Sequence, residues 1–177
     1  AACVPGPDAR IESGDLSAAF ARANLMTLQT VLLRKSAFLA AGGFDPRLRN
    51  NEDWDFNIRL SRQGPMGFLD TPLVVVFDSP DGISKDRWAS LASQVRIFSK
   101  LRRADVARAT LSEHAAGVAR LMLRRGRPRS ARRYLRWALA RGPVRPGHLA
   151  RYAFTAAPAL YRVVRLVRPG PRRFPSP

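Results

Sequence analysis

Apolar residues recur at helical spacing from Ser84 almost to the end of the chain. At the start of this region they lie three or four positions apart, at Trp88, Leu91, Val95 and Phe98. That spacing places them on one face of a helix. Two further helices are expected in 114–143, because the pattern is broken at Gly126–Pro128.

The last part of the chain continues this helical pattern. The small residues Ala131 and Ala138 fit a close crossing between the two helices of 114–143. Another helix is expected in 145–168, with an interruption at Pro158, and the tail after it is expected to be disordered.

The N-terminal half shows a different pattern, in which strand and helix signals alternate. Runs rich in valine and leucine predict strands at 27–34 and 67–77, the second either bent or split into a pair. Three short helices are expected around them: 15–23, one from Ser36 to Ala41, and one that begins at Asn51 or Asp53 and ends at Gly64.

Charge divides the chain into two regions. Residues 1–95 carry 10 basic and 11 acidic residues, whereas residues 96–177 carry 21 basic and 2 acidic residues. The predicted domains are therefore 1–95 and 96–177, and each needs its own functional account.

The sequence carries few signals of cellular location or of proteolytic processing. The single cysteine, Cys3, excludes an intrachain disulfide, which fits a reducing compartment. No apolar run reaches the roughly 18 residues that span a bilayer. The N-terminus has no signal-peptide pattern and no initiator methionine, so the chain is expected to begin partway through a longer protein.

Three motifs follow one another between Asn24 and Ser84: NLMTLQTVLLRKSAFLAAGGFD, RLRNNEDWDFNIRLSRQG and MGFLDTPLVVVFDSPDGIS. In this order and spacing they resemble the C-terminal, acceptor-side half of the catalytic domain of family 2 glycosyltransferases. The resemblance implies an α/β fold, with a partial GT-A domain in 1–95. Residues 96–177 would then be a basic all-α extension that ends in the disordered tail.

The triplet Asp53-Trp54-Asp55 has the form of a metal-binding DxD motif. In the family that motif follows an apolar strand, but RLRNNE precedes Asp53 here. The triplet therefore resembles the family's later acidic motif, which implies that Asp53 is the catalytic base and that Glu52 supports it or binds an acceptor hydroxyl. Such a base takes the proton of the acceptor hydroxyl as its oxygen attacks the anomeric carbon. A helix N-terminus keeps the carboxylate ionised, and Arg59 is expected to be a structural partner of this cluster.

Five neighbours are candidates for substrate binding, each with a structural alternative: Gly42, Gly43, Asp45, Trp54 and Asp55. The glycine pair allows backbone to approach a sugar closely. Asp45 either binds the acceptor or caps its turn, and Trp54 either stacks on a sugar ring or lies in the core. Asp55 either binds substrate or forms a salt bridge at the start of the helix.

The resemblance also implies partners that these residues do not supply. A divalent cation, Mg²⁺ or Mn²⁺, is expected for the family, with its main ligands outside this chain. Asp78 is a candidate oxygen ligand, because Ser79 stands where many family members have a histidine. A nucleotide-binding first half is also missing, so the chain alone is expected to be inactive.

The basic region concentrates arginine beside aromatic residues, in the stretch LMLRRGRPRSARRYLRWALAR. One interpretation is a surface for anionic lipid, with Tyr134 and Trp137 at the interface. Another is a solvated or protein-facing surface. Nucleic-acid binding is disfavoured, because no motif for it is present. His114 and His148 are interpreted as ordinary helix residues.

These observations lead to two candidate functions from different classes. The first is an inverting glycosyltransferase that moves a sugar from a nucleotide-sugar donor to a hydroxyl of a glycan or lipid-linked acceptor in cell-surface glycan synthesis. Its expected location is the cytoplasm, peripheral on the inner face of the cell membrane. The alternative is a non-catalytic basic helical module that binds an anionic membrane or nucleic acid.

Overall fold

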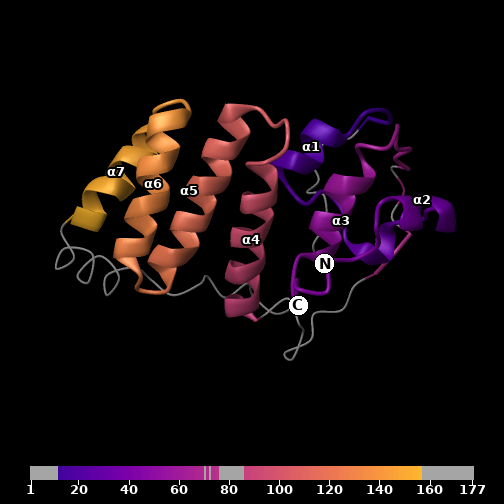
Figure 1. Cartoon of the computed structure of the whole chain (residues 1–177), viewed down its shortest axis with the longest axis horizontal. Coiled ribbons are helices and arrows are strands. Elements are labelled where there is room, and N and C mark those ends of the chain that lie inside the picture. Colours follow the sequence, from indigo (N-terminus) through magenta and orange to yellow (C-terminus); the bar gives the residue numbers. More distant parts are fainter. Residues whose placement is uncertain (1–11, 70, 72, 76–85, 157–177) are drawn as a thin grey trace.

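The computed structural model describes residues 12–69, 71, 73–75 and 86–156 (Figure 1). Regular structure in this part is helical. The elements in chain order are α1 (Ser17–Arg22), η1 (Leu28–Thr30, a 3-10 helix), α2 (Lys35–Ala40), α3 (Glu52–Leu60), α4 (Arg87–Leu101), α5 (Arg108–Arg124), α6 (Pro128–Arg141) and α7 (Pro146–Ala156).

The four C-terminal helices, α4 to α7, stand side by side in one layer, and α1 to α3 gather beyond α4 (Figure 1). Within the layer, α5 packs against both α4 and α6, and α7 packs on α6. The chain turns from α5 into α6 at Gly126, whose φ of 68° lies in the left-handed region. Glycine enters that region without a steric penalty, so the break expected at Gly126–Pro128 is confirmed.

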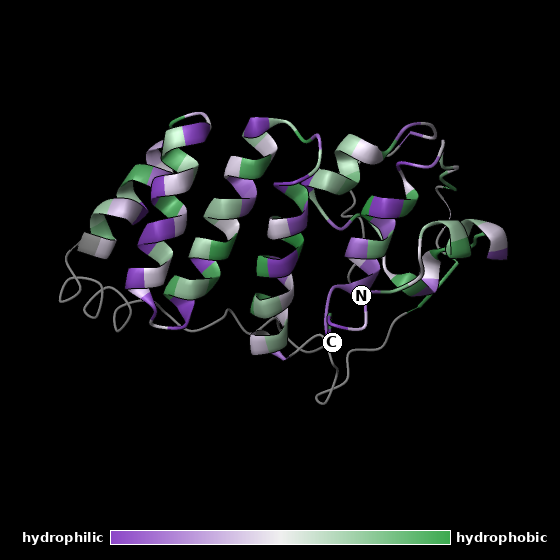
Figure 2. Cartoon of the chain, in the orientation of Figure 1, coloured by the Kyte–Doolittle hydropathy of each residue, from purple (hydrophilic) through white to green (hydrophobic). Residues whose placement is uncertain are grey.

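One hydrophobic core joins the two charge regions. Its buried side chains come from α1, α3, α4, α5 and α6 and include Phe20, Trp54, Ile97, Phe98 and Leu101. Helices of the layer carry hydrophobic and hydrophilic residues in alternation along their length (Figure 2). The predicted division after residue 95 falls inside α4, so the change in charge occurs within a helix that belongs to the shared core.

The close crossing expected at Ala131 and Ala138 is confirmed. Both alanines on α6 are completely buried, and the Ser112 hydroxyl of α5 donates a hydrogen bond to the Ala138 carbonyl at 3.0 Å. Small side chains at these positions let the two helices approach each other.

The expected α/β class is wrong, because the described residues contain no strand and so form no partial GT-A domain. The segment 27–34 holds η1 instead of a strand, and no described position of 67–77 is a strand. The remaining positions of 67–77 lie outside the described residues. One isolated antiparallel bridge joins Gly14 to Met66.

The physical reason for this difference lies in backbone pairing. A strand needs a neighbour to satisfy its N–H and C=O groups. In the part of the chain that the structure describes, no segment pairs with either apolar run. Several of their side chains are open to solvent, with Leu32 fully exposed and Val75 77% exposed, whereas Leu33 packs against the buried cluster of Ala41, Phe56 and Leu60.

The helices expected in the N-terminal half are present, with shifted ends. The helix α2 begins at Lys35 with Arg34 as its N-cap residue, so Ser36 lies inside the helix rather than at its cap. The helix α3 follows Asn51, as expected, but ends at Leu60 rather than Gly64. The expected interruption at Pro158 and the tail lie outside the described residues.

Helix length and polarity also bear on membrane insertion. None of the described helices combines the length and the apolar character that a bilayer-crossing segment requires.

Candidate functional site

Asp53 lies in the first turn of α3, partly buried and close to the end of α1. Its Oδ1 accepts hydrogen bonds from the Asn24 side-chain amide at 3.2 Å and from the Trp54 backbone N–H at 2.7 Å. Its Oδ2 has no hydrogen-bond or ion-pair partner among the described residues. One oxygen therefore orients the carboxylate, and the other remains able to accept a proton.

The chain enters α3 through an unusual backbone conformation. Asn51 has a φ of 57° and a ψ of 25°, in the left-handed region that asparagine tolerates better than most residues. The acidic residues of the first turn, Glu52, Asp53 and Asp55, then lie near the positive end of the helix dipole. Glu52 is partly buried and has no ion-pair partner in the described part of the chain.

Asp55 differs from Asp53 because both of its oxygens are occupied. The residue is 3% exposed. Its Oδ1 lies 2.6 Å from Lys100 Nζ, and its Oδ2 lies 3.0 Å from Arg59 Nη2. This geometry favours the salt-bridge alternative for Asp55 over substrate binding.

Asp45 belongs to the same ionic network. Its Oδ2 lies 2.8 Å from Lys100 Nζ, so one ammonium group joins α4 to both acidic residues. The Arg47 guanidinium forms a bidentate pair with Asp45, and the Arg47 backbone N–H donates to Oδ1 at 3.0 Å. Hydrogen bonds from the Arg47 side chain and then from Lys100 hold the pKa of Asp45 well below its usual value. These contacts favour the turn-capping alternative.

The Gly42–Gly43 turn is held against α3 by Arg59. The guanidinium donates to the carbonyl of Ala41 and, at 2.7 Å, to that of Gly43. Both glycines have positive φ, 77° and 59°, and a Cβ on Gly43 would lie 3.3 Å from the Phe38 ring. The turn therefore needs glycine for its own conformation, and the structural role expected of Arg59 is confirmed.

Trp54 lies in the core. It is 8% exposed, its indole N–H donates to the Phe20 carbonyl at 2.8 Å, and its ring lies 5.3 Å from the ring of His114. The core alternative thus accounts for Trp54 without a sugar. His114 also contacts the Ala21 carbonyl through Nε2, and burial lowers the pKa of its imidazole.

Three residues that complete this region were not identified from the sequence: Asn24, Lys100 and His114. Asn24 orients Asp53, Lys100 neutralises Asp45 and Asp55, and His114 packs on Trp54. Lys100 carried a signal, since it is one of three lysines beside 28 arginines. The other two contacts join segments far apart in the chain and left no local pattern.

Metal binding finds no support in the described part of the chain. No group of three or more His, Cys, Asp or Glu side chains is placed to hold a metal ion there. Asp78, the candidate ligand, lies outside the described residues. A cavity of about 500 Å³ lies between α4 and α6, and none of its lining residues comes from 42–60.

Comparisons with known proteins assign neither a family nor a function to this chain. Neither a protein-family model, nor a curated protein, nor a solved structure matches this chain. The candidate site therefore rests on the geometry around Asp53.

Proposed function

We propose that residues 24–60 supply the acceptor-side base of an inverting glycosyl transfer, with Asp53 as that base. The observation that carries the proposal is the contrast among the three aspartates. Asp45 and Asp55 are neutralised by cations, whereas Asp53 is oriented through Oδ1 and keeps Oδ2 open. A general base needs this combination of fixed orientation and an unoccupied oxygen.

The proposed step uses this oxygen directly. The acceptor hydroxyl transfers its proton to Asp53 Oδ2 as its oxygen forms a bond to the anomeric carbon. The bond from that carbon to the nucleotide diphosphate breaks on the opposite face, and the diphosphate leaves with the bonding electrons. Glu52 lies one residue away in the same turn and would bind a neighbouring acceptor hydroxyl or support the base.

The donor nucleotide-sugar and a divalent cation, Mg²⁺ or Mn²⁺, would be bound outside the described residues. Large apolar side chains of 28–39 and 69–75 are exposed, and a partner that covers them would fit this proposal: Leu28, Leu32, Leu39, Leu69, Leu73 and Val75. On this proposal the acceptor is a glycan or lipid-linked sugar, and the enzyme works at the cytoplasmic face of a membrane.

The test is Asp53→Asn in the full-length gene product. Asparagine preserves the shape and the Asn24 contact but cannot take the proton, so turnover is expected to fall by about 10²–10⁴-fold while donor binding survives. Turnover and donor affinity would be measured together. The matched control is Asp105→Asn, which alters an exposed aspartate outside the site. Near-normal turnover of Asp53→Asn would refute the assignment.

A second candidate function follows from the other end of α4. Trp88 is 53% exposed, and the guanidinium carbons of Arg125 and Arg127 lie 4.5 Å and 5.0 Å from the centre of its ring. An exposed tryptophan beside two arginines suits the interface of an anionic membrane. This arrangement favours the alternative of a basic helical module that docks on a membrane.

Vesicle co-sedimentation tests this second function. Binding to phosphatidylcholine vesicles that contain phosphatidylglycerol is expected, with loss of binding at high salt and in Trp88→Ala. Binding that is unchanged in Trp88→Ala would reject this docking site. Tight, salt-sensitive binding to any DNA duplex without vesicle binding would instead favour nucleic acid.

A further inference from the structure

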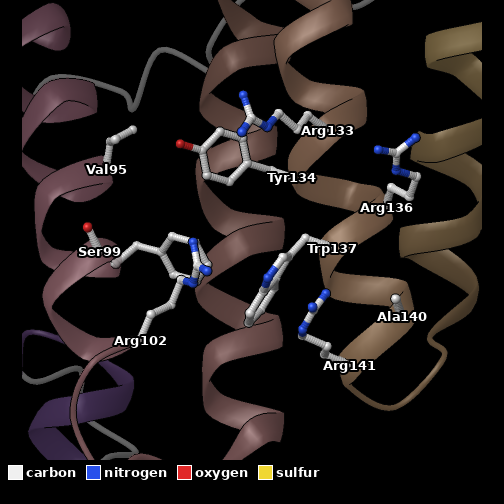
Figure 3. A pocket seen from close by; sticks show the side chains of 10 residues that line it. Val95, Ser99, Arg102, Arg133, Tyr134, Arg136, Trp137, Ala140 and Arg141 are labelled. Carbon is white, nitrogen blue, oxygen red and sulfur yellow. The ribbon is translucent and has the colours of Figure 1, made fainter.

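A groove runs between α4 and α6 on the face of the helical layer. Its volume is about 500 Å³, within the range of small-molecule sites. The lining residues come from two helices only: Val95, Phe98, Ser99 and Arg102 from α4, and Arg133, Tyr134, Arg136, Trp137, Ala140 and Arg141 from α6. Figure 3 shows Arg102 from one helix and Tyr134 and Trp137 from the other reaching toward the space between them.

The floor of the groove is aromatic and rigidly packed. The Phe98 ring meets the Trp137 ring edge-on, with 5.1 Å between centroids and an interplanar angle of 88°. The same Phe98 ring lies 5.9 Å from the ring of Tyr134. Phe98 is almost completely buried, whereas Tyr134 and Trp137 are partly open. The floor therefore offers fixed apolar faces to the organic part of a ligand.

The walls of the groove are strongly basic. Four of its ten lining residues are arginines, and none is acidic. Arg102, Arg133, Arg136 and Arg141 have no carboxylate partner among the described residues. The groove therefore carries positive charge that no carboxylate of the described residues neutralises.

Two of these guanidinium groups flank the Trp137 ring (Figure 3). The Cζ atoms of Arg102 and Arg141 lie 5.5 Å and 5.1 Å from the centre of the Trp137 ring. The indole N–H of Trp137 is buried and has no acceptor. Polar groups buried in this way are usually satisfied. Two cations without a carboxylate partner thus lie beside one aromatic ring of the groove, where an oxygen-rich anion would neutralise them, whereas the indole N–H is covered by protein atoms and is not part of the site.

We propose that the α4–α6 groove binds a phosphate group carried on an organic molecule, a phosphomonoester or a diphosphate. Arg102 and Arg141 hold the phosphate oxygens, because guanidinium groups bind phosphate through charge-assisted, bidentate hydrogen bonds. Trp137 and Tyr134 contact the organic part. This site stands apart from Asp53 and does not depend on the proposed glycosyl transfer.

The experiment measures binding of inorganic pyrophosphate to the full chain by calorimetry. Affinity is expected to fall by about tenfold or more in the double variant Arg102→Gln, Arg141→Gln. The matched control is Arg108→Gln, Arg120→Gln, which removes the same charge from exposed positions of α5 outside the groove. Because all four arginines are exposed, both variants are expected to keep the wild-type melting temperature.

A second double variant in the groove keeps the proposal testable if the first one fails to fold. Arg133→Gln with Arg136→Gln removes two other lining cations, and it is expected to weaken binding more than the control pair. If wild-type chain binds neither pyrophosphate nor vesicles of phosphatidylcholine with phosphatidic acid, the proposal fails. It also fails if the control pair loses as much affinity as the groove pairs, since binding would then follow total charge, as it would for nucleic acid.

Two binding measurements, one with vesicles and one with pyrophosphate, distinguish a lipid headgroup from a soluble phosphate compound. Phosphatidic acid presents a monoester headgroup at a surface, whereas phosphatidylglycerol presents a diester of lower charge. Preference for phosphatidic-acid vesicles, reversed by pyrophosphate and lost in the groove pairs, would identify a lipid headgroup. Binding of pyrophosphate with no such vesicle preference would identify a soluble phosphate compound.

Discussion

The buried carboxylate of Asp55 is stabilised in the folded protein by ion pairs with two cations. Its side chain is 4% exposed and lies between Arg59 and Lys100, whose own side chains are 29% and 37% exposed. Replacing it leaves Arg59 without an anionic partner among the described residues, whereas Lys100 keeps its ion pair with Asp45. An unpaired charge at a partly buried position costs more than the pair contributes when intact.

Asp55→Asn is therefore expected to lower the free energy of unfolding by about 2 kcal/mol, as measured by chemical denaturation. The exposed control Asp105→Asn is expected to stay within about 0.5 kcal/mol of wild type. Equal stability of the two variants would show that the ion pairs of Asp55 contribute nothing net.

The burial of His114 makes the free energy of unfolding depend on pH. Burial is the main cause that lowers the pKa of its imidazole, while the contact with the Ala21 carbonyl acts in the opposite direction. As the pH falls below about 6.5, the unfolded chain takes up a proton that the folded chain resists. The free energy of unfolding should therefore decrease as the pH falls through this range.

His114→Gln removes this titration and should flatten the decrease between about pH 7 and pH 5, measured by urea denaturation across that range. The slope is expected to be reduced rather than abolished, because burial also lowers the pKa of His148. A slope identical to that of wild type would contradict the assignment to His114.

At the scale of elements, the α5–α6 hairpin depends on the absence of a side chain at Gly142. A Cβ there would overlap the Cβ and Oγ atoms of Ser112, which is completely buried. Gly117, in the middle of α5, has open space around its would-be Cβ. Gly117 and Gly142 therefore differ in how they should respond to alanine.

Gly142→Ala is expected to destabilise the protein by about 1–3 kcal/mol through overpacking. Gly117→Ala is expected to stabilise it by about 0.5–1 kcal/mol, because alanine favours the helix more than glycine does. Thermal unfolding of both variants provides the test. Unchanged or increased stability of Gly142→Ala would contradict the close packing of Ser112 against Gly142.

At the scale of the whole molecule, the shared core predicts that the two charge regions unfold together. Leu101 of α4 is 1% exposed and belongs to the same core as Trp54 of α3 and Leu111 of α5. Leu101→Ala is expected to lower the free energy of unfolding by about 2–5 kcal/mol. Backbone amides of α3 and α5 should lose protection from hydrogen exchange together.

Hydrogen exchange in this variant distinguishes one unit from two. Loss of protection in α5 while α3 keeps wild-type protection would contradict joint unfolding and support the predicted division after residue 95.

The N-terminal half shows where local pattern misleads. The run TLQTVLLR has the composition of a strand, but composition supplies no partner for its backbone groups. In the described part of the chain those residues form η1 and exposed extended backbone. A helix needs no partner segment, since its backbone N–H and C=O groups form hydrogen bonds within the helix itself.

The sequence by itself determined the helices of the C-terminal half, the turn at Gly126 and the burial of Ala131 and Ala138, because these follow from spacing within about one or two helical turns. It also singled out Asp53 among the acidic residues, although its catalytic role stays a prediction. Only the tertiary structure decided which carboxylates are neutralised. Lys100 reaches Asp55 across 45 positions, and a contact between such distant residues exists only after the core has brought α4 against α3.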